Sequence, residues 1–140
     1  MTRKVRAMEI REYTAFREDE IRRLYASVGW KAYTDNMSAL EQGFGHSLLV
    51  MAAFEGGKLL GIIRVVGDGH TIVFLQDILV DPDHQRKGIG TALVQAVLDR
   101  YPAVRQIQLT ADSTPESTAF YRSLGFTELA KIGCSGWMKC

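Results

Sequence analysis

The sequence predicts a mixed α/β fold built on one central sheet. Strand-like runs rich in β-branched and aromatic residues are separated by glycine turns between residues 47 and 80. Segments with apolar residues at three- and four-residue spacing, typical of amphipathic helices, flank this region on both sides. A chain of 140 residues can bury a substantial core, and we expect a single domain over residues 1–140.

The N-terminal part is expected to form one strand and two helices. Residues 8–13 are predicted to be the first strand. In the helix that follows, the apolar residues recur at helical spacing: Ile21, Leu24, Tyr25 and Val28. Residues 30–34 are interpreted as an aromatic-rich connector. A second short helix is expected over residues 35–44, with Thr34 or Asp35 as its N-cap.

A meander of three strands is predicted next. Residues 47–55 and 58–66 flank the Gly56-Gly57 pair, which favours a tight hairpin because both glycines accept a positive φ. Asp68-Gly69 marks a second turn, which precedes a strand over residues 71–80. Strands joined by such short turns pair in antiparallel fashion, so most of the sheet is expected to be antiparallel.

Helices and strands alternate in the C-terminal part. A helix over residues 90–100 and a strand over residues 105–110 complete a strand–helix–strand unit, which implies a right-handed parallel crossover. The residues expected to be buried on this helix share one face: Ile89, Leu93, Ala96 and Val97. A last helix is predicted over residues 115–124, ending at Gly125. The tail over residues 127–139 is expected to supply two short final strands.

The junction after the strand at residues 71–80 carries the clearest functional pattern. Residues 85–90 read QRKGIG, with two glycines at the beginning of a helix. The first N–H groups of a helix lack internal acceptors, and the helix dipole adds partial positive charge beside them. Glycines let a phosphate approach this backbone, and Arg86 and Lys87 add full charges. The pattern predicts a pyrophosphate site, but neither a P-loop nor a dinucleotide fingerprint, since GxxxxGK[ST] is absent and Leu93 occupies the third glycine position.

This segment resembles the acyl-CoA-binding motif (Q/R)xxGx(G/A) of the GNAT N-acetyltransferase superfamily. A second segment, residues 119–126 with the sequence AFYRSLGF, resembles the C-terminal motif of that superfamily. The resemblance covers nearly the whole chain from about Met8. It implies a GNAT fold with a mixed, mostly antiparallel sheet splayed between strands 4 and 5, and about four helices. The pantetheine arm of acetyl-CoA would lie in that opening.

The resemblance implies acetyl-CoA as the acyl donor and direct transfer of its acetyl group to an amine. The residues implied to hold the cofactor come from the fourth strand, the loop and two helices: Ile78, Leu79, Val80, Gln85, Arg86, Lys87, Gly88, Ile89, Gly90, Thr91, Phe120 and Tyr121. Backbone N–H groups near Leu79 and Val80 are expected to stabilise the oxyanion. Many relatives hold the pantetheine with an Asn before the last helix, where this chain has Ser113, Thr114 or Ser117.

Tyr121 is implied to be the proton donor to the departing thiolate. A tyrosine with a pKa near ~10 is a weaker acid than a thiol near ~8.5, so the transfer is uphill by roughly 2 kcal/mol. Either the site lowers the tyrosine pKa, or Tyr121 acts mainly by hydrogen bonding. The run that contains Asp112 is similar to that of plant-type serotonin (arylalkylamine) N-acetyltransferases, which favours Asp112 and Tyr121 as the catalytic pair. Asp77 and water remain alternatives for the base. If Phe74, Gln76 and Ile78 face the acceptor, strand alternation turns Asp77 the other way, and a bulge in the strand would change this.

The acceptor is expected to contact Trp30, Tyr33 and Asp77. These two aromatic side chains, together with Tyr25, could line a pocket for an aromatic or apolar amine through stacking or cation–π contact. The leading prediction is therefore transfer to a primary amine of a small molecule. A protein or peptide amine is the alternative substrate, and a non-catalytic acetyl-CoA-binding module is the alternative function.

Net charge, hydropathy and the spacing of histidines and cysteines restrict the classes of partner that we expect. A formal net charge of +1 gives no electrostatic case for nucleic acid or an anionic membrane. No apolar run is long enough to span a bilayer, so a cytoplasmic location is expected. The three histidines lie in separate segments, which argues against a metal site, and Cys134 and Cys140 are expected to be free thiols. A homodimer is kept as an expectation because dimers through the C-terminal strands are common among such relatives.

Overall fold

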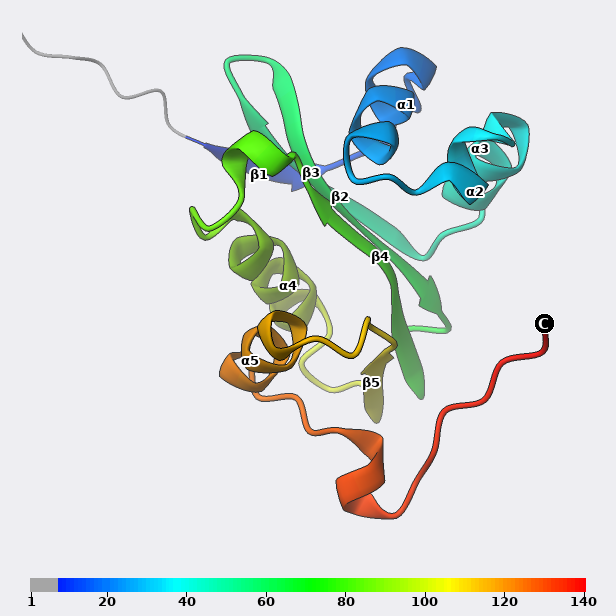
Figure 1. The fold of residues 1–140 in the computed structure, drawn as a ribbon, viewed down its shortest axis with the longest axis vertical. Coiled ribbons are helices and arrows are strands. Elements are labelled where there is room, and N and C mark those ends of the chain that lie inside the picture. Colours follow the sequence, from blue (N-terminus) through cyan, green and yellow to red (C-terminus); the bar gives the residue numbers. More distant parts are fainter. Residues whose placement is uncertain (1–7) are drawn as a thin grey trace, which may run out of the picture. The chain divides into compact units, whose positions relative to one another are not determined.

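The computed structural model describes residues 8–140. These residues belong to two compact units, with the boundary between Gln108 and Leu109. The first unit contains the helices α1 to α4 and the sheet apart from Leu109, the last residue of β5, and the second contains helix α5 and the C-terminal tail (Figure 1).

A mixed sheet in the order β1-β2-β3-β4-β5 organises the first unit. Neighbouring strands from β1 to β4 are antiparallel, and β5 runs parallel to β4, which confirms the predicted fold class. The backbone N–H groups of Arg105 and Gln106 donate to His70 and Thr71, at the beginnings of the two parallel strands. The strands are Glu9–Glu12 (β1), Leu49–Glu55 (β2), Lys58–Gly67 (β3), Ile72–Val80 (β4) and Gln106–Leu109 (β5).

The described residues contain five α-helices: Glu18–Ser27 (α1), Lys31–Thr34 (α2), Met37–Gly45 (α3), Ile89–Arg100 (α4) and Pro115–Ser123 (α5). About four were expected, and the additional one is α2. This single helical turn lies where a connector was predicted over residues 30–34, so that interpretation was wrong. Figure 1 shows α1, α2 and α3 on one face of the sheet and α4 on the other.

The N-cap of α3 also differs from the prediction. Asn36 is the cap, and its side chain accepts a hydrogen bond of 3.1 Å from the backbone N–H of Ala39. Asp35 has helical dihedral angles (φ −74°, ψ −13°), because it still belongs to the turn begun by α2. An N-cap residue needs a non-helical conformation, which Asn36 adopts (φ −143°, ψ 70°). Neither Thr34 nor Asp35 can therefore cap α3.

The core lies between the sheet and the helices on its two faces. The predicted face of α1 is confirmed, since Ile21, Leu24 and Tyr25 are fully buried. On α4 the expectation was correct except at one position. Its buried residues are Ile89, Leu93, Val94 and Val97, whereas Ala96 is only half-buried.

The predicted final strands are absent from the described tail. Residues Leu129–Ile132 form a short 3-10 helix, η2, which ends at Gly133 with φ 78°. Its hydrogen bonds are local: the N–H of Lys131 donates to Glu128, and that of Cys134 donates to Leu129. A strand needs a neighbouring strand to satisfy its backbone groups, whereas this turn satisfies them within its own segment. The prediction of two strands over residues 127–139 was wrong.

Strand β4 contains a bulge. Arg64 on β3 lies opposite Asp77, but the next residue, Val65, lies opposite Leu75. Gln76 is therefore the extra residue of β4. A bulge reverses the side-chain alternation of the strand beyond it, so Asp77 and Leu75 no longer share a face even though they are two residues apart. Strand β4 thus contains the bulge that Asp77 needs in order to face the acceptor, and the Asp77 side chain lies on the side of helices α1 to α3.

Candidate functional site

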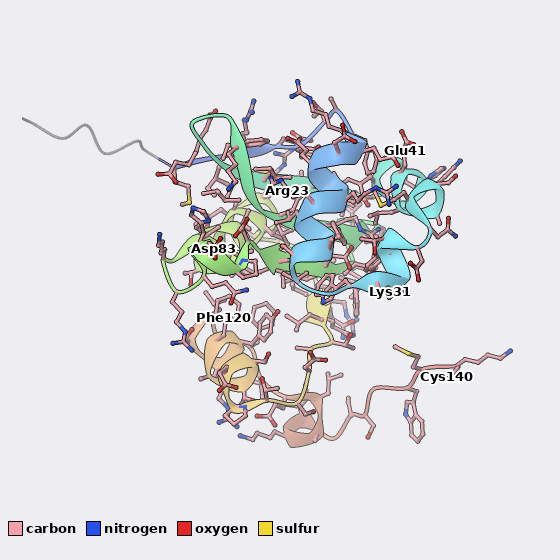
Figure 2. All side chains as sticks on the ribbon, turned by 45° about the horizontal axis from the view of Figure 1, so that its top comes forward. Arg23, Lys31, Glu41, Asp83, Phe120 and Cys140 are labelled. Atoms are coloured by element: carbon pink, nitrogen blue, oxygen red, sulfur yellow. The ribbon has the colours of Figure 1, made fainter. Side chains whose placement is uncertain are left out.

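The turn after β4 leads directly into helix α4. The Asp81 side chain accepts a hydrogen bond of 2.9 Å from the N–H of Asp83 and so caps a 3-10 turn over Pro82–His84. Figure 2 marks this turn with Asp83. The side chain of Gln85 then donates to the carbonyl of Val80 at 3.1 Å, which ties the loop back to the end of the strand.

The loop over residues 85–90 has the backbone of an anion site. Arg86 and Gly88 have positive φ angles, 62° and 82°, and Arg86 is the one non-glycine residue of this kind among the described residues. A non-glycine residue in this conformation is uncommon and is enriched at functional sites. Within residues 8–140, no side chain caps the N-terminus of α4. Its first N–H groups are thus available to an external acceptor, next to the exposed Arg86 and Lys87.

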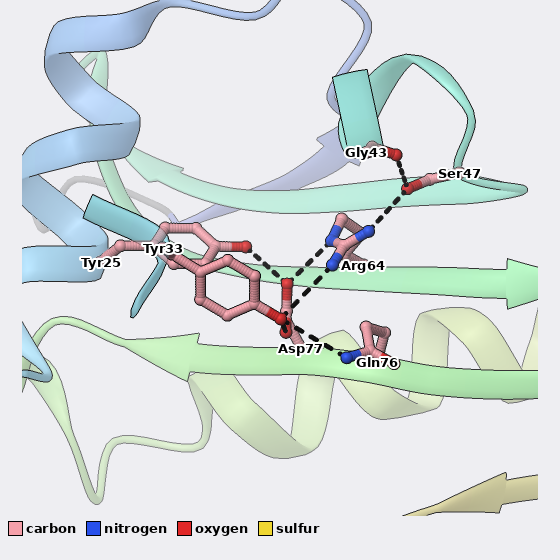
Figure 3. Close-up of polar contacts among 7 residues, drawn as sticks. All are labelled: Tyr25, Tyr33, Gly43, Ser47, Arg64, Gln76 and Asp77. Carbon is pink, nitrogen blue, oxygen red and sulfur yellow. Dashed lines mark hydrogen bonds and ion pairs between the residues drawn. The ribbon is translucent and has the colours of Figure 1, made fainter. Parts of the chain in front are cut away.

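A buried polar cluster lies on the other face of the sheet, where α1 and α2 pack (Figure 3). Asp77 is only 2% exposed, and three donors surround its carboxylate. Tyr25 and the Nε of Arg64 donate to Oδ2 at 3.0 and 2.8 Å, and Tyr33 donates to Oδ1 at 2.6 Å. The bulge at Gln76 creates this cluster, because it places Asp77 opposite Arg64 and toward the helices.

The structure brings the three predicted acceptor residues together. Tyr33 and Asp77 share a hydrogen bond, and Trp30 packs beside Tyr33 with ring centroids 6.1 Å apart. Asp77 itself is enclosed, whereas Tyr33 is half-buried. Sequence reasoning missed Arg64. The available signal was a single charge inside the apolar run LLGIIRVV, since a buried charge requires a partner.

The electrostatics of the cluster keep its two tyrosines neutral and Arg64 charged. Burial raises the pKa of Tyr25, and the adjacent Asp77 carboxylate raises it further. Burial and the hydrogen bond to Asp77 also raise the pKa of Tyr33. Burial acts against the charge of Arg64, but Asp77 outweighs it, so the pKa of this guanidinium stays above its usual value. Both phenols are thus neutral donors to a carboxylate paired with a cation.

These raised tyrosine pKa values predict a loss of stability in alkali. Above pH ~10 the tyrosines of the unfolded chain lose their protons, whereas Tyr25 and Tyr33 in the folded chain keep theirs. The folded state then binds more protons than the unfolded state, so the free energy of unfolding falls as the pH rises. We expect the urea midpoint to decrease from pH 9.5 to 11, and to decrease less in Tyr33→Phe. An equal decrease in both proteins would contradict this assignment.

A cavity of about 260 Å³ opens beside this cluster. Its lining combines small apolar residues of α2 and α3 with three polar side chains: Ala32, Ala39, Leu40, Gly43, Tyr33, Asn36 and Arg64. All of these residues belong to the first unit. The cavity joins Tyr33, predicted to contact the acceptor, to Arg64, which was not predicted.

The second unit carries both residues of the predicted catalytic pair, Asp112 and Tyr121. Thr114 caps α5 by accepting a 3.1 Å hydrogen bond from the N–H of Ser117, so its hydroxyl already has a structural role. Tyr121 is half-buried, and its ring packs against Phe120 and Phe126 with centroids 4.9 and 6.0 Å away. Burial raises the pKa of Tyr121. This direction is opposite to the one required by the hypothesis that the site lowers the tyrosine pKa.

Asp112 is exposed at the beginning of the second unit. Its backbone carbonyl accepts a 2.9 Å hydrogen bond from Thr114. Among the side-chain hydrogen bonds of residues 109–140, none joins Asp112 to Tyr121. Cys134 and Cys140 are separate, exposed thiols. Across the described chain, no helix combines the length and apolar character needed to cross a membrane.

Comparison with known proteins gives a consistent family assignment. Residues 6–126 match the model of the Acetyltransferase (GNAT) family. A GNAT-family acetyltransferase from Streptococcus pneumoniae, SP0256, has a solved structure that is 36% identical, with a TM-score of 0.87 over 96% of this chain and 98% of that chain. An aminoglycoside N-acetyltransferase solved with CoA is 22% identical, with a TM-score of 0.70 over 91% of this chain and 93% of that one, and so shares the fold.

Curated relatives match over shorter stretches. The GCN5-related N-acetyltransferase 2 of Arabidopsis thaliana is 40% identical over 73 residues, which make up 49% of this chain and 27% of the plant protein. The YqkA protein of Bacillus subtilis is 34% identical over 79 residues, or 56% of this chain and 23% of that protein. The chain therefore spans about a quarter of the length of these two relatives.

Proposed function

The chain belongs to the GNAT family of acetyltransferases, and on that premise we propose that it transfers an acetyl group from acetyl-CoA to a primary amine of a small molecule. Acetyl-CoA-dependent acetyl transfer is the general activity of this family. The observation that carries the proposal is the loop over residues 85–90. It combines two left-handed residues, an N-terminus of α4 without a side-chain cap among the described residues, and two exposed cations.

The diphosphate of acetyl-CoA is the ligand that fits this loop best. The segment from Gln85 to Thr91 would bind its oxygens through backbone N–H groups, with Arg86 and Lys87 contributing charge. The end of β4, from Ile78 to Val80, would hold the pantetheine arm through its backbone. The CoA complex of the aminoglycoside N-acetyltransferase, which has the same fold, supports this proposal.

On the acceptor side, Tyr33 and Trp30 would contact the substrate at the cavity of α2 and α3. Asp77 contributes as a positioning residue, because its carboxylate fixes the hydroxyl of Tyr33 at 2.6 Å. Asp77 is only 2% exposed and both of its carboxylate oxygens already accept hydrogen bonds, so an acceptor amine cannot reach it directly, which disfavours this residue as the base. The exposed Asp112 is therefore favoured as the base, with water as the alternative.

Burial raises the pKa of Tyr121, which favours the hypothesis that it acts on the departing thiolate mainly by hydrogen bonding, and Tyr121→Phe tests this role. We expect kcat to fall on the order of 100-fold, the lower range for losing one preorganised hydrogen-bond donor, while the affinity for acetyl-CoA changes little. Tyr101→Phe, a substitution at the end of α4, serves as the control and should keep kcat. A Tyr121→Phe protein with unchanged kcat would remove Tyr121 from the chemistry.

The function itself is tested by following free thiol from acetyl-CoA with a panel of amines. Release with small primary amines is expected, and activity with peptides alone would favour the alternative of a protein or peptide N-acetyltransferase. Tight acetyl-CoA binding with no thiol release for any amine would instead favour a non-catalytic binding module. The cytoplasmic location and the homodimer stay predictions from the sequence.

A further inference from the structure

We propose that the acceptor amine also carries a carboxylate, which Arg64 binds inside the cavity of α2 and α3. The inference rests on the proposed function because it takes the occupant of this cavity to be the acceptor.

Only one edge of the Arg64 guanidinium is firmly occupied. Its Nε donates to Asp77 at 2.8 Å, whereas Nη1 and Nη2 lie 3.4 Å from the Ser47 hydroxyl and 3.5 Å from the Tyr33 hydroxyl. Hydrogen bonds of that length are weak, and each terminal nitrogen carries two N–H groups. The terminal nitrogens can therefore donate to a ligand in the cavity, which Arg64 lines. Figure 3 shows their contacts on the side of Tyr33 and Ser47.

Asp77 lies at the Nε edge of Arg64, so the side with the terminal nitrogens Nη1 and Nη2 stays positive. Both carboxylate oxygens of Asp77 accept hydrogen bonds from tyrosines, and Oδ2 also accepts from Nε of Arg64. Among the described residues that line the cavity, Arg64 is the one ionised side chain. A planar guanidinium presenting two terminal nitrogens matches a carboxylate, which can accept from both at once.

Aromatic contacts exclude an ammonium group from the same place. The guanidinium carbon of Arg64 lies 6.0 Å from the ring centroid of Tyr33 and 5.8 Å from that of Phe44. Arg64 thus already provides the cation for these two rings. The cation–π contact with an amine that the sequence suggested for Tyr33 would bring a second positive charge beside Arg64, which is unfavourable.

The cavity wall also restricts the chemistry of the acceptor. The wall at Ala32, Ala39 and Leu40 is apolar. An amino acid with a modest aliphatic side chain combines the required amine, carboxylate and apolar group. A polycationic acceptor does not fit this wall and this charge.

The test compares leucine, leucinamide and isoamylamine, which differ in the group that faces Arg64. Binding to the CoA-saturated protein is measured by ligand-observed NMR, and acetylation by thiol release. We expect leucine to bind about tenfold tighter than leucinamide or isoamylamine, a typical gain for a charge-assisted pair. Arg64→Lys, which keeps the charge but loses the planar fork, should reduce this preference, whereas Arg22→Lys on the exposed face of α1 should not.

A second variant avoids the buried ion pair. A Cβ added at Gly43 would lie 3.3 Å from Nη1 of Arg64, whereas one added at Gly45 on the same helix meets no atom within 4 Å. Alanine is favoured over glycine inside a helix, so both variants should fold. Gly43→Ala should weaken the binding of leucine several-fold without weakening isoamylamine, and Gly45→Ala should change neither.

Equal affinity for leucine and leucinamide, or a preference that survives Arg64→Lys, would overturn the carboxylate site. If isoamylamine were still acetylated in that case, the proposed function would remain intact. Leucine that binds through Arg64 while no amine in the panel is acetylated would refute the proposed function and retain the anion site.

Discussion

Asp77→Ala is expected to lower the free energy of unfolding by about 3–5 kcal/mol, the usual cost of removing one member of a buried ion pair. Asp77 and Arg64 are 2% and 7% exposed, so the guanidinium left behind would remain out of water without its counter-ion. The hydroxyl of Tyr25, a fully buried residue, would lose its acceptor as well. Unfolding in urea, followed by circular dichroism, measures this loss.

The double variant Arg64→Met/Asp77→Leu separates the cost of a buried unpaired charge from the cost of lost side-chain volume. Removing both charges together should cost much less than removing one, because no unpaired charge remains. Glu18→Ala is a surface control, since its 2.8 Å pair with Arg22 is exposed and should contribute less than about 1 kcal/mol. A loss below 1 kcal/mol for Asp77→Ala would show that the cluster in Figure 3 is not a buried ion pair in solution.

Gly90→Asp is expected to weaken acetyl-CoA binding on the order of 100-fold. Two unit charges about 4 Å apart repel by about 4 kcal/mol at an effective dielectric of 20, and salt screening reduces this value. An aspartate in the first turn of α4 should not destabilise the helix, because its charge is favourable beside the N-terminus. Gly90→Asn introduces a side chain of the same shape as aspartate but without its charge, so this variant should retain most of the affinity. Comparable melting temperatures would show that both variants are folded.

The loop and the hairpins could be predicted because their signals are local. The QRKGIG run lies between a strand pattern and a helix pattern, and both glycines at 56 and 57 have the positive φ that a tight hairpin requires. The face of α1 followed from spacing alone. Each of these features depends on residues within a few positions of one another, which a single sequence shows directly.

The polar cluster could not be predicted because it depends on register. Nothing in the run TIVFLQDILV marks Gln76 as an extra residue, since the bulge exists only relative to the pairing with β3. The partners of Asp77 come from three other elements, α1, α2 and β3. Sequence reasoning therefore placed Asp77 near the acceptor without identifying its counter-ion, Arg64.

The helix caps and the tail show how neighbouring segments decide local structure. Thr34 and Asp35 have side chains suited to capping, but the turn of α2 extends through them and moves the cap to Asn36. The glycines at 133 and 136 suggested a turn between strands, yet Gly133 ends a 3-10 helix instead. Turn residues alone do not distinguish these outcomes, because both use a glycine with positive φ.

Calorimetric titration with acetyl-CoA and with S-acetylpantetheine most directly tests whether residues 85–90 bind a diphosphate. The two ligands share the acetyl group and the pantetheine arm, and only acetyl-CoA carries the diphosphate and the nucleotide. We predict that acetyl-CoA binds on the order of 100-fold more tightly, and that Gly90→Asp removes most of this difference. Equal affinity for the two ligands, or a difference that Gly90→Asp leaves unchanged, would contradict the account.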